Sequence, residues 1–396
     1  WAGARFGEGS GAWRDRFGFG AVLIASGVLA IRFVPGWLAR GVAALWRCAG
    51  GHWRRWEFWP AALFYLPVAA NYVRLAVRYR GLTLPVAANP GMAFGGVVGE
   101  SKYATLRELY ERDPDATAES WLLSRGETED RCAAFRRLVA EAGIEFPLIL
   151  KPDLGQRGLG VRRIGGLAEG EAYLRRTSAD VVVQRYDPGP FEAGVFYYRF
   201  PGEERGRLFA ITEKIFPSVV GDGVRTLEEL VRADARARWI ADRYLRRLGP
   251  RVSEVPPPGR SVPLVATGNH AQGCIFRDGW RWWTPELEQR FDAISRRLPG
   301  FFVGRYDVRF GDEEEFRSGR GFRIVELNGA SAEATSIYDE RHSIRTAYAT
   351  LFRQWDLVFA IGAANRARGI RSVDPATLWR AWRDSSRLFA TYPSAD

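Results

Sequence analysis

Cysteine, histidine and lysine are scarce in this sequence of 396 residues, which contains three of each. Cys48, Cys132 and Cys274 lie far apart and form no CxxC pair. The sequence therefore predicts neither a disulfide framework nor a zinc site, and the scattered histidines point the same way. Small, buried, reduced cysteines are typical of a cytoplasmic protein.

The scarcity of lysine says more about function than the scarcity of cysteine and histidine does. Of the 57 basic residues, only Lys102, Lys151 and Lys214 are lysines. A compact ammonium that is kept against such a bias toward arginine marks a position where a planar guanidinium is no substitute. The alternative is that three lysines remain by chance. The surroundings of each lysine decide between these two interpretations.

The net charge of +11 is unevenly distributed along the chain. Residues 1–80 contain eleven arginines against three carboxylates, among many tryptophans, phenylalanines and leucines. This mixture predicts contact between residues 1–80 and an anionic membrane surface, at the inner face of the membrane. The remaining chain is close to neutral and shows no basic β-surface or recognition helix, so no nucleic-acid partner is expected.

Two apolar stretches, 17–38 and 58–73, lie in this N-terminal region. The uncharged part of the first, 17–31, is shorter than the roughly 20 residues of a membrane span. The second contains Pro60 and Pro67. The sequence leaves open whether either stretch spans the bilayer or lies peripherally in the headgroup region. A third alternative is a helical pair packed on the rest of the protein. The oligomeric state is also left open.

From residue 81 onward the sequence is typical of an α+β enzyme. The periodicity predicts helices over 101–112, 130–142, 168–177, 226–247, 285–297 and 343–367. Strands are predicted over 146–151, 181–186, 194–200, 207–214, 302–310 and 322–328. Residues 253–263 are predicted to form a loop.

A glycine-rich segment, ILKPDLGQRGLGV, follows the first of these strands at residues 149–161. Lys151 ends the strand, and Gly155, Gly158 and Gly160 follow it. Glycines let backbone N–H groups turn toward phosphate oxygens, and a lysine adds a mobile positive charge. The segment is neither a Walker A loop nor a GxGxxG fingerprint. Taken alone, a glycine-rich hairpin turn is the simpler interpretation.

The segment VVVQRYDPGPFEAGV, residues 181–195, is a strand that runs into a Pro/Gly turn. Its backbone could pair with an adenine edge, and Glu192 could accept hydrogen bonds from ribose, although alone it is an ordinary strand and turn. Lys214 ends another strand, ahead of a tight turn and a helix capped at Thr226.

Two late strands carry alternating polar residues. Arg305 and Asp307 lie two residues apart, as do Glu326 and Asn328, so each pair shares one face of its strand. Adjacent strands would bring these oxygens to one point, which suits Mg²⁺. The alternative is that the carboxylates pair with arginines such as Arg305 on a solvated face.

In this order the elements resemble the ATP-grasp superfamily over roughly residues 98–345. The motifs are most similar to those of ligases of the D-alanine–D-alanine ligase and glutathione/cyanophycin synthetase type. The resemblance implies two α/β lobes that enclose ATP, with Arg305 and Lys214 in catalysis and metal ligation by Asp307, Glu326 and Asn328. The implied nucleotide-binding residues are Lys102, Lys151, Gly155, Gly158, Gly160, Gln184, Arg185, Tyr186, Glu192 and Lys214.

The resemblance further implies an ADP-forming ligase that joins a small-molecule carboxylate to an amine through an acyl phosphate. ATP and one or two Mg²⁺ ions, or Mn²⁺, are the implied cofactors, and amino acids, peptides and lipid-linked molecules are the candidate substrates. A phosphotransferase on the same core and a catalytically silent, nucleotide-binding membrane adaptor are the alternatives. Gln184 replaces the usual hinge glutamate, and NGASAEATSIYDERHS replaces the usual Pro-Gly turn after the metal-binding asparagine. The identity of the acceptor is therefore left open.

The expected organisation has five parts. Residues 1–80 form the membrane-associated or packing helical region, and 81–145 form a linker with a reduced N-terminal domain. Residues 146–200 form the small lobe, 201–345 the large lobe and 346–396 a C-terminal helical segment.

Overall fold

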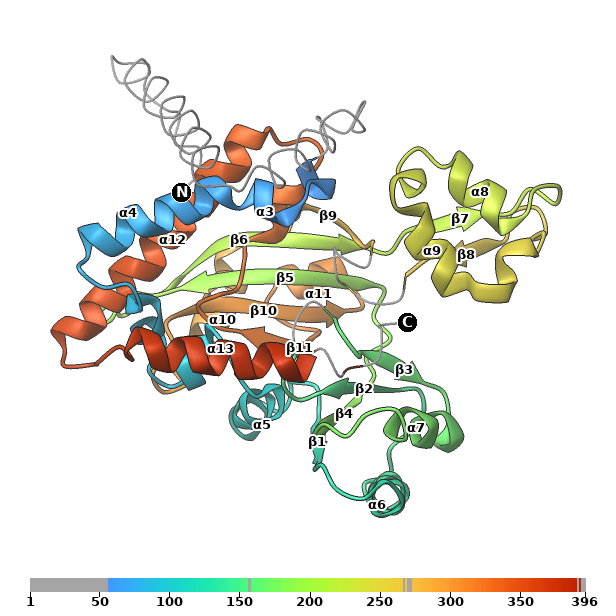
Figure 1. Cartoon of the computed structure of the whole chain (residues 1–396), viewed down its shortest axis with the longest axis horizontal. Helices are drawn as coiled ribbons and strands as arrows, with labels where there is room; N and C mark the ends of the chain where they lie inside the picture. The colour runs from blue at the N-terminus through green and yellow to red at the C-terminus, as the bar shows by residue number, and fades with distance from the viewer. Residues whose placement is uncertain (1–55, 156–157, 266–267, 269–272, 390–391, 393–396) are drawn as a thin grey trace.

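Two antiparallel sheets, each covered by helices, organise the computed structural model of the chain (Figure 1). The structure describes residues 56–155, 158–265, 268, 273–389 and 392. The α+β class predicted from the sequence is confirmed, as is the division into two lobes. The apolar stretch 17–38 lies outside the described residues.

The small lobe contains a four-stranded sheet in the order β1-β4-β2-β3. Its strands are β1 (Ser120–Leu123), β4 (Val181–Arg185), β2 (Leu148–Pro152) and β3 (Arg162–Ile164). The helices α6 (Thr128–Glu141) and α7 (Leu167–Leu174) belong to this lobe. Leu148 and Leu150 pack into its core with Phe135. Because side chains alternate along a strand, Lys151 lies on the opposite face of the sheet.

The large lobe contains a five-stranded sheet in the order β11-β10-β5-β6-β9. Its strands are β11 (Phe322–Asn328), β10 (Val303–Phe310), β5 (Phe191–Tyr198), β6 (Arg207–Ile215) and β9 (Ile275–Asp278). The strands cross the expected domain ranges. β1, from the segment 81–145, joins the small sheet, and β5, which begins within 146–200, pairs with β10 and β6 of the large sheet.

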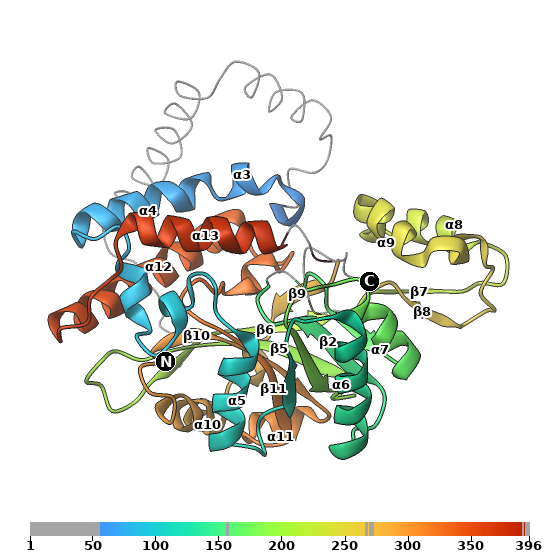
Figure 2. The ribbon, with the colours of Figure 1, turned by 60° about the horizontal axis from the view of Figure 1, so that its bottom comes forward.

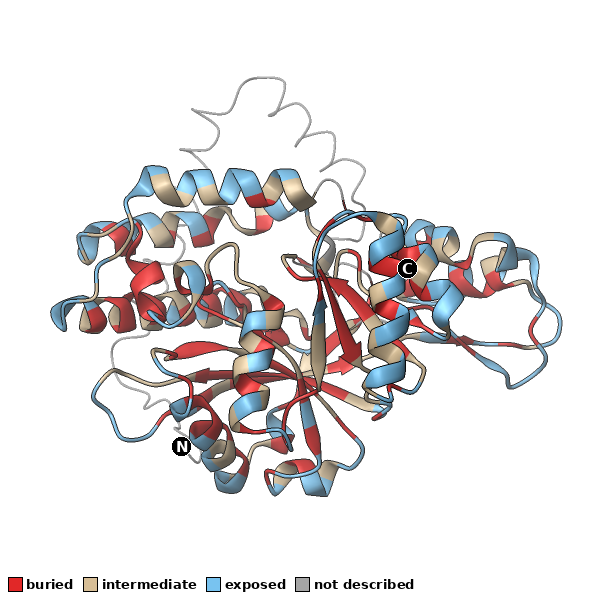
Figure 3. Cartoon of the chain, turned by 90° about the horizontal axis from the view of Figure 1, so that it is seen from below, coloured by how far each residue is buried: buried red, intermediate tan, exposed pale blue. Residues whose placement is uncertain are grey.

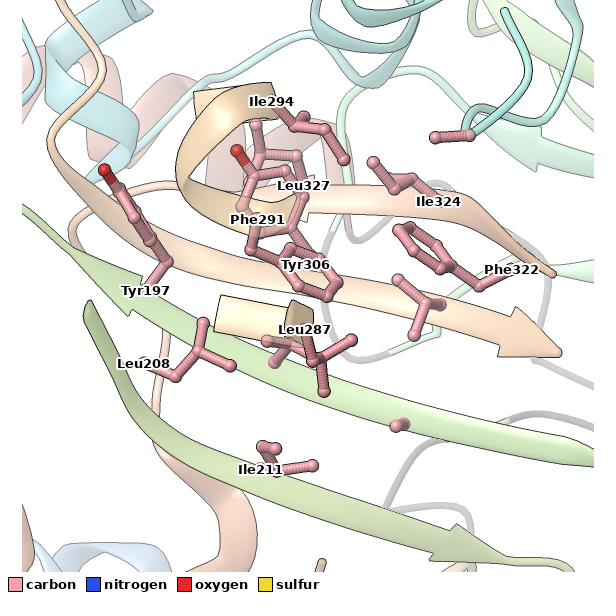
Figure 4. Close-up of a cluster of buried hydrophobic side chains, with 14 of the residues drawn as sticks. Tyr197, Leu208, Ile211, Leu287, Phe291, Ile294, Tyr306, Phe322, Ile324 and Leu327 are labelled. Carbon is pink, nitrogen blue, oxygen red and sulfur yellow. The ribbon is translucent and has the colours of Figure 1, made fainter. Parts of the chain in front are cut away.

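One face of the large sheet is covered by α10 (Pro285–Arg296) and α11 (Glu313–Arg317). Thr284 caps α10 by accepting a hydrogen bond from Leu287 N, and Pro285 takes the first turn, where it needs no N–H donor. Leu287, Phe291 and Ile294 follow at helical spacing and meet side chains of β5, β6, β10 and β11 (Figure 4). In Figure 3 the strands are largely buried, whereas the covering helices are exposed on their outer sides.

The other face of the large sheet packs against α12 (Ile344–Ala367), and α3 (Ala61–Phe64) and α4 (Leu66–Arg78) lie along α12 (Figures 1 and 2). Tyr348 donates a hydrogen bond to the Phe64 carbonyl, and Trp56 donates one to the Ile337 carbonyl. Pro67 occupies the first turn of α4 and does not interrupt it. Residues 56–78 therefore pack on the body of the protein, as one sequence alternative proposed.

None of the described helices is both long enough and apolar enough to cross a membrane. Membrane contact by residues 1–80 stays a prediction, because residues 1–55 lie outside the described part of the chain. The C-terminal helix α13 (Pro375–Phe389) lies beside the helices that cover the large sheet (Figure 2).

A small accessory unit projects from the large lobe (Figure 1). It contains β7 (Ser218–Val220), α8 (Leu227–Ala233), α9 (Ala241–Leu248) and β8 (Ser261–Pro263). The single helix predicted over 226–247 is wrong, because the Asp234 carboxylate accepts hydrogen bonds from Arg236 N and Ala237 N and turns the chain. Part of the loop predicted over 253–263 forms β8. The predicted cap at Thr226 is confirmed.

The helix expected over 101–112 is α5 (Lys102–Arg112), capped by Ser101. Short 3₁₀ segments complete the described chain at Trp56–Phe58, Leu84–Ala88, Ala93–Gly96, Ala237–Ile240, Gly249–Ser253, Trp280–Trp282 and Thr335–Tyr338.

Candidate active site

A cavity of about 1470 Å³ is lined by residues of both lobes. Residues of β2 and β4 line it from the small lobe, and residues of β5, β6, β10 and β11 line it from the large lobe. Helices α3, α4, α12 and α13 complete its wall. Lys102, Lys151 and Lys214, which are all the lysines of the chain, line this one cavity. Their convergence favours the interpretation that they are kept for their chemistry.

Each lysine ammonium is held by oxygen atoms. Lys102 Nζ lies 2.9 Å from Glu326 Oε1 and donates to the Gly155 carbonyl at 2.6 Å. Lys214 Nζ lies 2.9 Å from Glu192 Oε1 and 3.1 Å from Asp307 Oδ2. Each of the two predicted metal-binding carboxylates, Glu326 and Asp307, thus has a lysine ammonium beside it.

Lys151 differs from the other two lysines because its partners are neutral. Its ammonium donates to Gln184 Oε1 at 3.0 Å and to the Val325 carbonyl at 2.9 Å. Burial lowers its pKa to about 8. This ammonium therefore has more to gain from an anionic ligand than its two neighbours, which already meet carboxylates.

The register of β10 and β11 places the predicted oxygen ligands together. Asp307 lies directly opposite Glu326, and Arg305 lies opposite Asn328. Paired residues of antiparallel strands project from the same face of the sheet, so all four side chains reach the cavity, and all four line it. The predicted convergence of Asp307, Glu326 and Asn328 is observed, and their role as metal ligands stays a prediction.

The sequence alternative, in which the carboxylates pair with arginine, describes part of this arrangement. Arg305 Nε lies 2.8 Å from Asp307 Oδ1, and its second nitrogen lies 3.2 Å from Asp307 Oδ2. The pair is not on a solvated face, because the Asp307 side chain is only 7% exposed and that of Arg305 only 17%. The same guanidinium donates to the Glu333 carbonyl at 3.0 Å, which fixes it at the base of the cavity.

The electrostatics of the cluster follow from burial and mutual attraction. Burial disfavours the charged forms of Lys102 and Lys214, but attraction to Glu326 and to Asp307 outweighs it and raises the pKa of each lysine. Burial would raise the pKa of Glu326, but Lys102 and Lys151 lower it well below its ordinary value. The cluster is therefore charged at neutral pH. Buried charge of this density is typical of a binding or catalytic site.

The oxygen donors of the cavity fit a hard divalent cation. Two carboxylates and one side-chain amide share a face, and magnesium prefers such oxygen ligands. The Asn328 Nδ2 atom is buried and has no hydrogen-bond partner among the described residues. The described part of the chain contains no cluster of three His, Cys, Asp or Glu residues arranged for a metal. Besides the two carboxylates, a cation here would thus need the side-chain oxygen of Asn328 and oxygens of a bound phosphate.

Of the other predicted nucleotide-binding residues, some line the cavity and one does not. Gly155 and Gly158 line the cavity. Gly160 is not among its described lining residues, and the Gly160 carbonyl accepts a hydrogen bond from the Tyr173 hydroxyl at 2.8 Å. Arg185 lines the cavity but pairs with Glu119 at 3.0 Å. Tyr186, also at the cavity, lies beneath the guanidinium of Arg309.

The sequence analysis did not identify the carboxylate of Glu100 or most of the aromatic residues that line one wall of the cavity. Glu100 lines the cavity two residues before Lys102, and its only sequence signal is that proximity. The aromatic wall comes from residues 56–65, the segment after β11 and α12. Tyr65 of the first of these donates a hydrogen bond to the carboxylate of Glu333, which follows β11, at 3.0 Å. The lining residues of this wall include Trp56, Trp59, Phe64, Tyr65, Tyr338 and Trp355.

No protein-family profile matches the sequence, and no curated protein matches it either. Solved structures to which the chain is similar include a bifunctional glutathione synthetase from Pasteurella multocida, with 17% identity and a TM-score of 0.33 over 66% of this chain and 38% of that one. The VanG D-Ala:D-Ser ligase from Enterococcus faecalis has 12% identity and a TM-score of 0.38, over 66% of this chain and 61% of that one.

The D-cycloserine synthetase DcsG is similar at 13% identity and a TM-score of 0.36, over 64% of this chain and 70% of that chain. The chain thus spans little more than a third of the glutathione synthetase. The likeness is distant, and the residues of the cavity decide what the site can bind.

Proposed function

We propose that this protein is an ATP-dependent, ADP-forming ligase that joins a carboxylate to an amine through an acyl phosphate. The observation that supports it best is the meeting of the chain's three lysines with Asp307 and Glu326 in one cavity. Ammonium groups bind phosphates, and the carboxylates beside them bind the cation that accompanies a triphosphate. A binding site for neutral ligands has no need of so many buried charges.

In this proposal the triphosphate lies between Lys151 of the small lobe and Lys214 of the large lobe, with Gly155 and Gly158 along the phosphates. The substrate carboxylate attacks the γ-phosphorus, which yields ADP and an acyl phosphate. The amine then attacks the carbonyl carbon, and inorganic phosphate leaves. Arg305 stabilises the negative charge that develops on the carbonyl oxygen, because its guanidinium is already oriented before the reaction.

Asp307, Glu326 and Asn328 would hold one or two magnesium ions, or manganese. Such an ion supplies positive charge that neutralises the phosphate oxygens during transfer. The aromatic wall and the helix α13 shield the cavity from bulk water, which would otherwise hydrolyse an acyl phosphate. The substrates are a small-molecule carboxylate and amine.

The test combines ADP release with trapping of the acyl phosphate by hydroxylamine. The full chain is incubated with ATP, Mg²⁺ and a pool of L- and D-amino acids and dipeptides. ADP and a hydroxamate, detected by mass spectrometry, are the expected products. A phosphorylated alcohol without hydroxamate would instead identify a kinase, and tight ATP binding without any turnover would identify a silent adaptor.

A further inference from the structure

The loop that precedes α5 is clamped onto the turn that follows β11. Ala330 N donates to the Gly95 carbonyl at 3.0 Å, and Ser331 N donates to the Gly96 carbonyl at 3.2 Å. Gly96 has a φ of +70°, and a Cβ there would lie 2.4 Å from the Gly329 Cα. Only two glycines allow the backbones to come so close, so the contact depends on residues 233 positions apart in sequence.

This clamp fixes the Glu100 side chain at the cavity. Gly329 N donates to Glu100 Oε2 at 3.3 Å. Gly329 directly follows Asn328, which lies opposite Arg305 in the sheet. The carboxylate therefore lies at the same end of β10 and β11 as Arg305, on the cavity side. Burial raises the pKa of Glu100 to about 7, although attraction to Lys102 and Arg305 opposes this rise, while Glu326 adds to it.

The reaction needs a proton acceptor at this place. An alkyl amine is an ammonium at neutral pH and has no electron pair with which to attack a carbonyl carbon. The carboxylates of Asp307 and Glu326 are engaged by Arg305, Lys214 and Lys102. Glu100 differs from them, because it accepts a hydrogen bond from a neutral backbone N–H, that of Gly329. It is also close to the arginine assigned to the carbonyl oxygen.

We propose that Glu100 binds the amine substrate as its ammonium and accepts one proton from it. This rests on the proposed ligase function. The neutral nitrogen then forms the bond to the carbonyl carbon, and the bond from that carbon to the phosphate oxygen breaks. The second proton of the nitrogen leaves with the departing phosphate, and Glu100 returns its proton to solvent when the amide leaves. The amine substrate accordingly arrives as an ammonium ion that carries at least two N–H protons.

The test compares two nucleophiles in the Glu100→Gln variant of the full chain. Methylamine is an ammonium at neutral pH, whereas hydroxylamine is largely unprotonated and needs no base before it attacks. Both probes are supplied with ATP, Mg²⁺ and the same pool of amino acids and dipeptides. Amide formation with methylamine should fall by about 10²–10⁴-fold, the usual worth of general base catalysis, while hydroxamate formation persists. Glutamine keeps an oxygen that can accept from Gly329 N, so the fold should be retained.

Glu111→Gln is the matched control, because Glu111 is an exposed carboxylate on α5 that pairs with Arg107. It should leave both products at wild-type amounts. Equal loss of amide and hydroxamate in Glu100→Gln, or no loss of either, would overturn the assignment. So would a wild-type protein that makes hydroxamate but no methylamide. Failure of the ligase function itself has a different signature, since the wild-type protein would then form no hydroxamate.

Discussion

Replacing Lys151 by alanine is expected to lower the rate of ADP formation by about 10²–10³-fold, the usual cost of removing one preorganised charge from a transition state. Lys151 is buried and donates hydrogen bonds to two neutral oxygens, Gln184 Oε1 and the Val325 carbonyl. Its loss therefore leaves no carboxylate unpaired, and the variant should fold. Steady-state ADP release and the thermal midpoint, measured side by side, check both parts.

The same lysine predicts a pH dependence. Burial lowers the pKa of Lys151 from 10.5 to about 8, so the ammonium loses its proton as the pH rises through that value. The affinity of the wild-type protein for ATP should then fall above pH of about 8, and the Lys151→Ala variant should lack this fall. The free energy of unfolding changes in the opposite direction to the affinity for ATP. Between the folded pKa of about 8 and the unfolded pKa of 10.5, the unfolded chain binds more protons than the folded one, so the contribution of Lys151 to stability increases as the pH rises.

Arg107→Ala is the control for Lys151→Ala, because Arg107 is an exposed cation on α5, outside the cavity. It should leave the rate of ADP formation and the affinity for ATP unchanged. Wild-type ATP affinity and ADP release in Lys151→Ala would contradict the placement of the phosphates.

Replacing Glu326 by glutamine is expected to lower ADP formation by a similar factor, about 10²–10³-fold, and to raise the concentration of Mg²⁺ needed for half-maximal rate. The substitution keeps the size of the side chain and an oxygen acceptor for Lys102, whose ammonium now lies 2.9 Å from Glu326 Oε1. Glu326→Ala should be less stable than Glu326→Gln, because it leaves the buried Lys102 ammonium without an oxygen acceptor at this position.

Titration of the ADP-forming rate with Mg²⁺ and with Mn²⁺ measures this effect. Glu228→Gln, on the exposed face of α8, is the control and should titrate like the wild-type protein. A Glu326→Gln variant with an unchanged rate and unchanged metal requirement would show that Glu326 serves only to pair with Lys102.

The sequence predicts the convergence of Asp307, Glu326 and Asn328 because all three residues lie on strands. The period of two along β10 and β11 places Asp307, Glu326 and Asn328 on faces that can be deduced from spacing alone. Antiparallel pairing of these two strands, which follow one another in the chain with α11 between them, then places Asp307 opposite Glu326 and Arg305 opposite Asn328. The three lysines stand out by composition, because so few basic residues of the chain are lysine.

The parts that the sequence did not predict depend on contacts between distant segments. Glu100 reaches the cavity only because Gly96 approaches Gly329, and no local pattern encodes that approach. The aromatic wall requires residues 56–65 to pack on α12, nearly 300 residues later in the chain. The break after α8 comes from one side chain, Asp234, that offers the backbone a better hydrogen-bond acceptor than the helix does.

The most direct measurement is an experimental structure of the full chain with Mg²⁺ and a non-hydrolysable ATP analogue. The triphosphate should lie between Lys151 and Lys214, and the metal should contact oxygens of Asp307, Glu326 and Asn328. A nucleotide bound elsewhere, or a cavity in which Asp307 and Glu326 keep their present ion pairs while no metal is bound, would contradict the account.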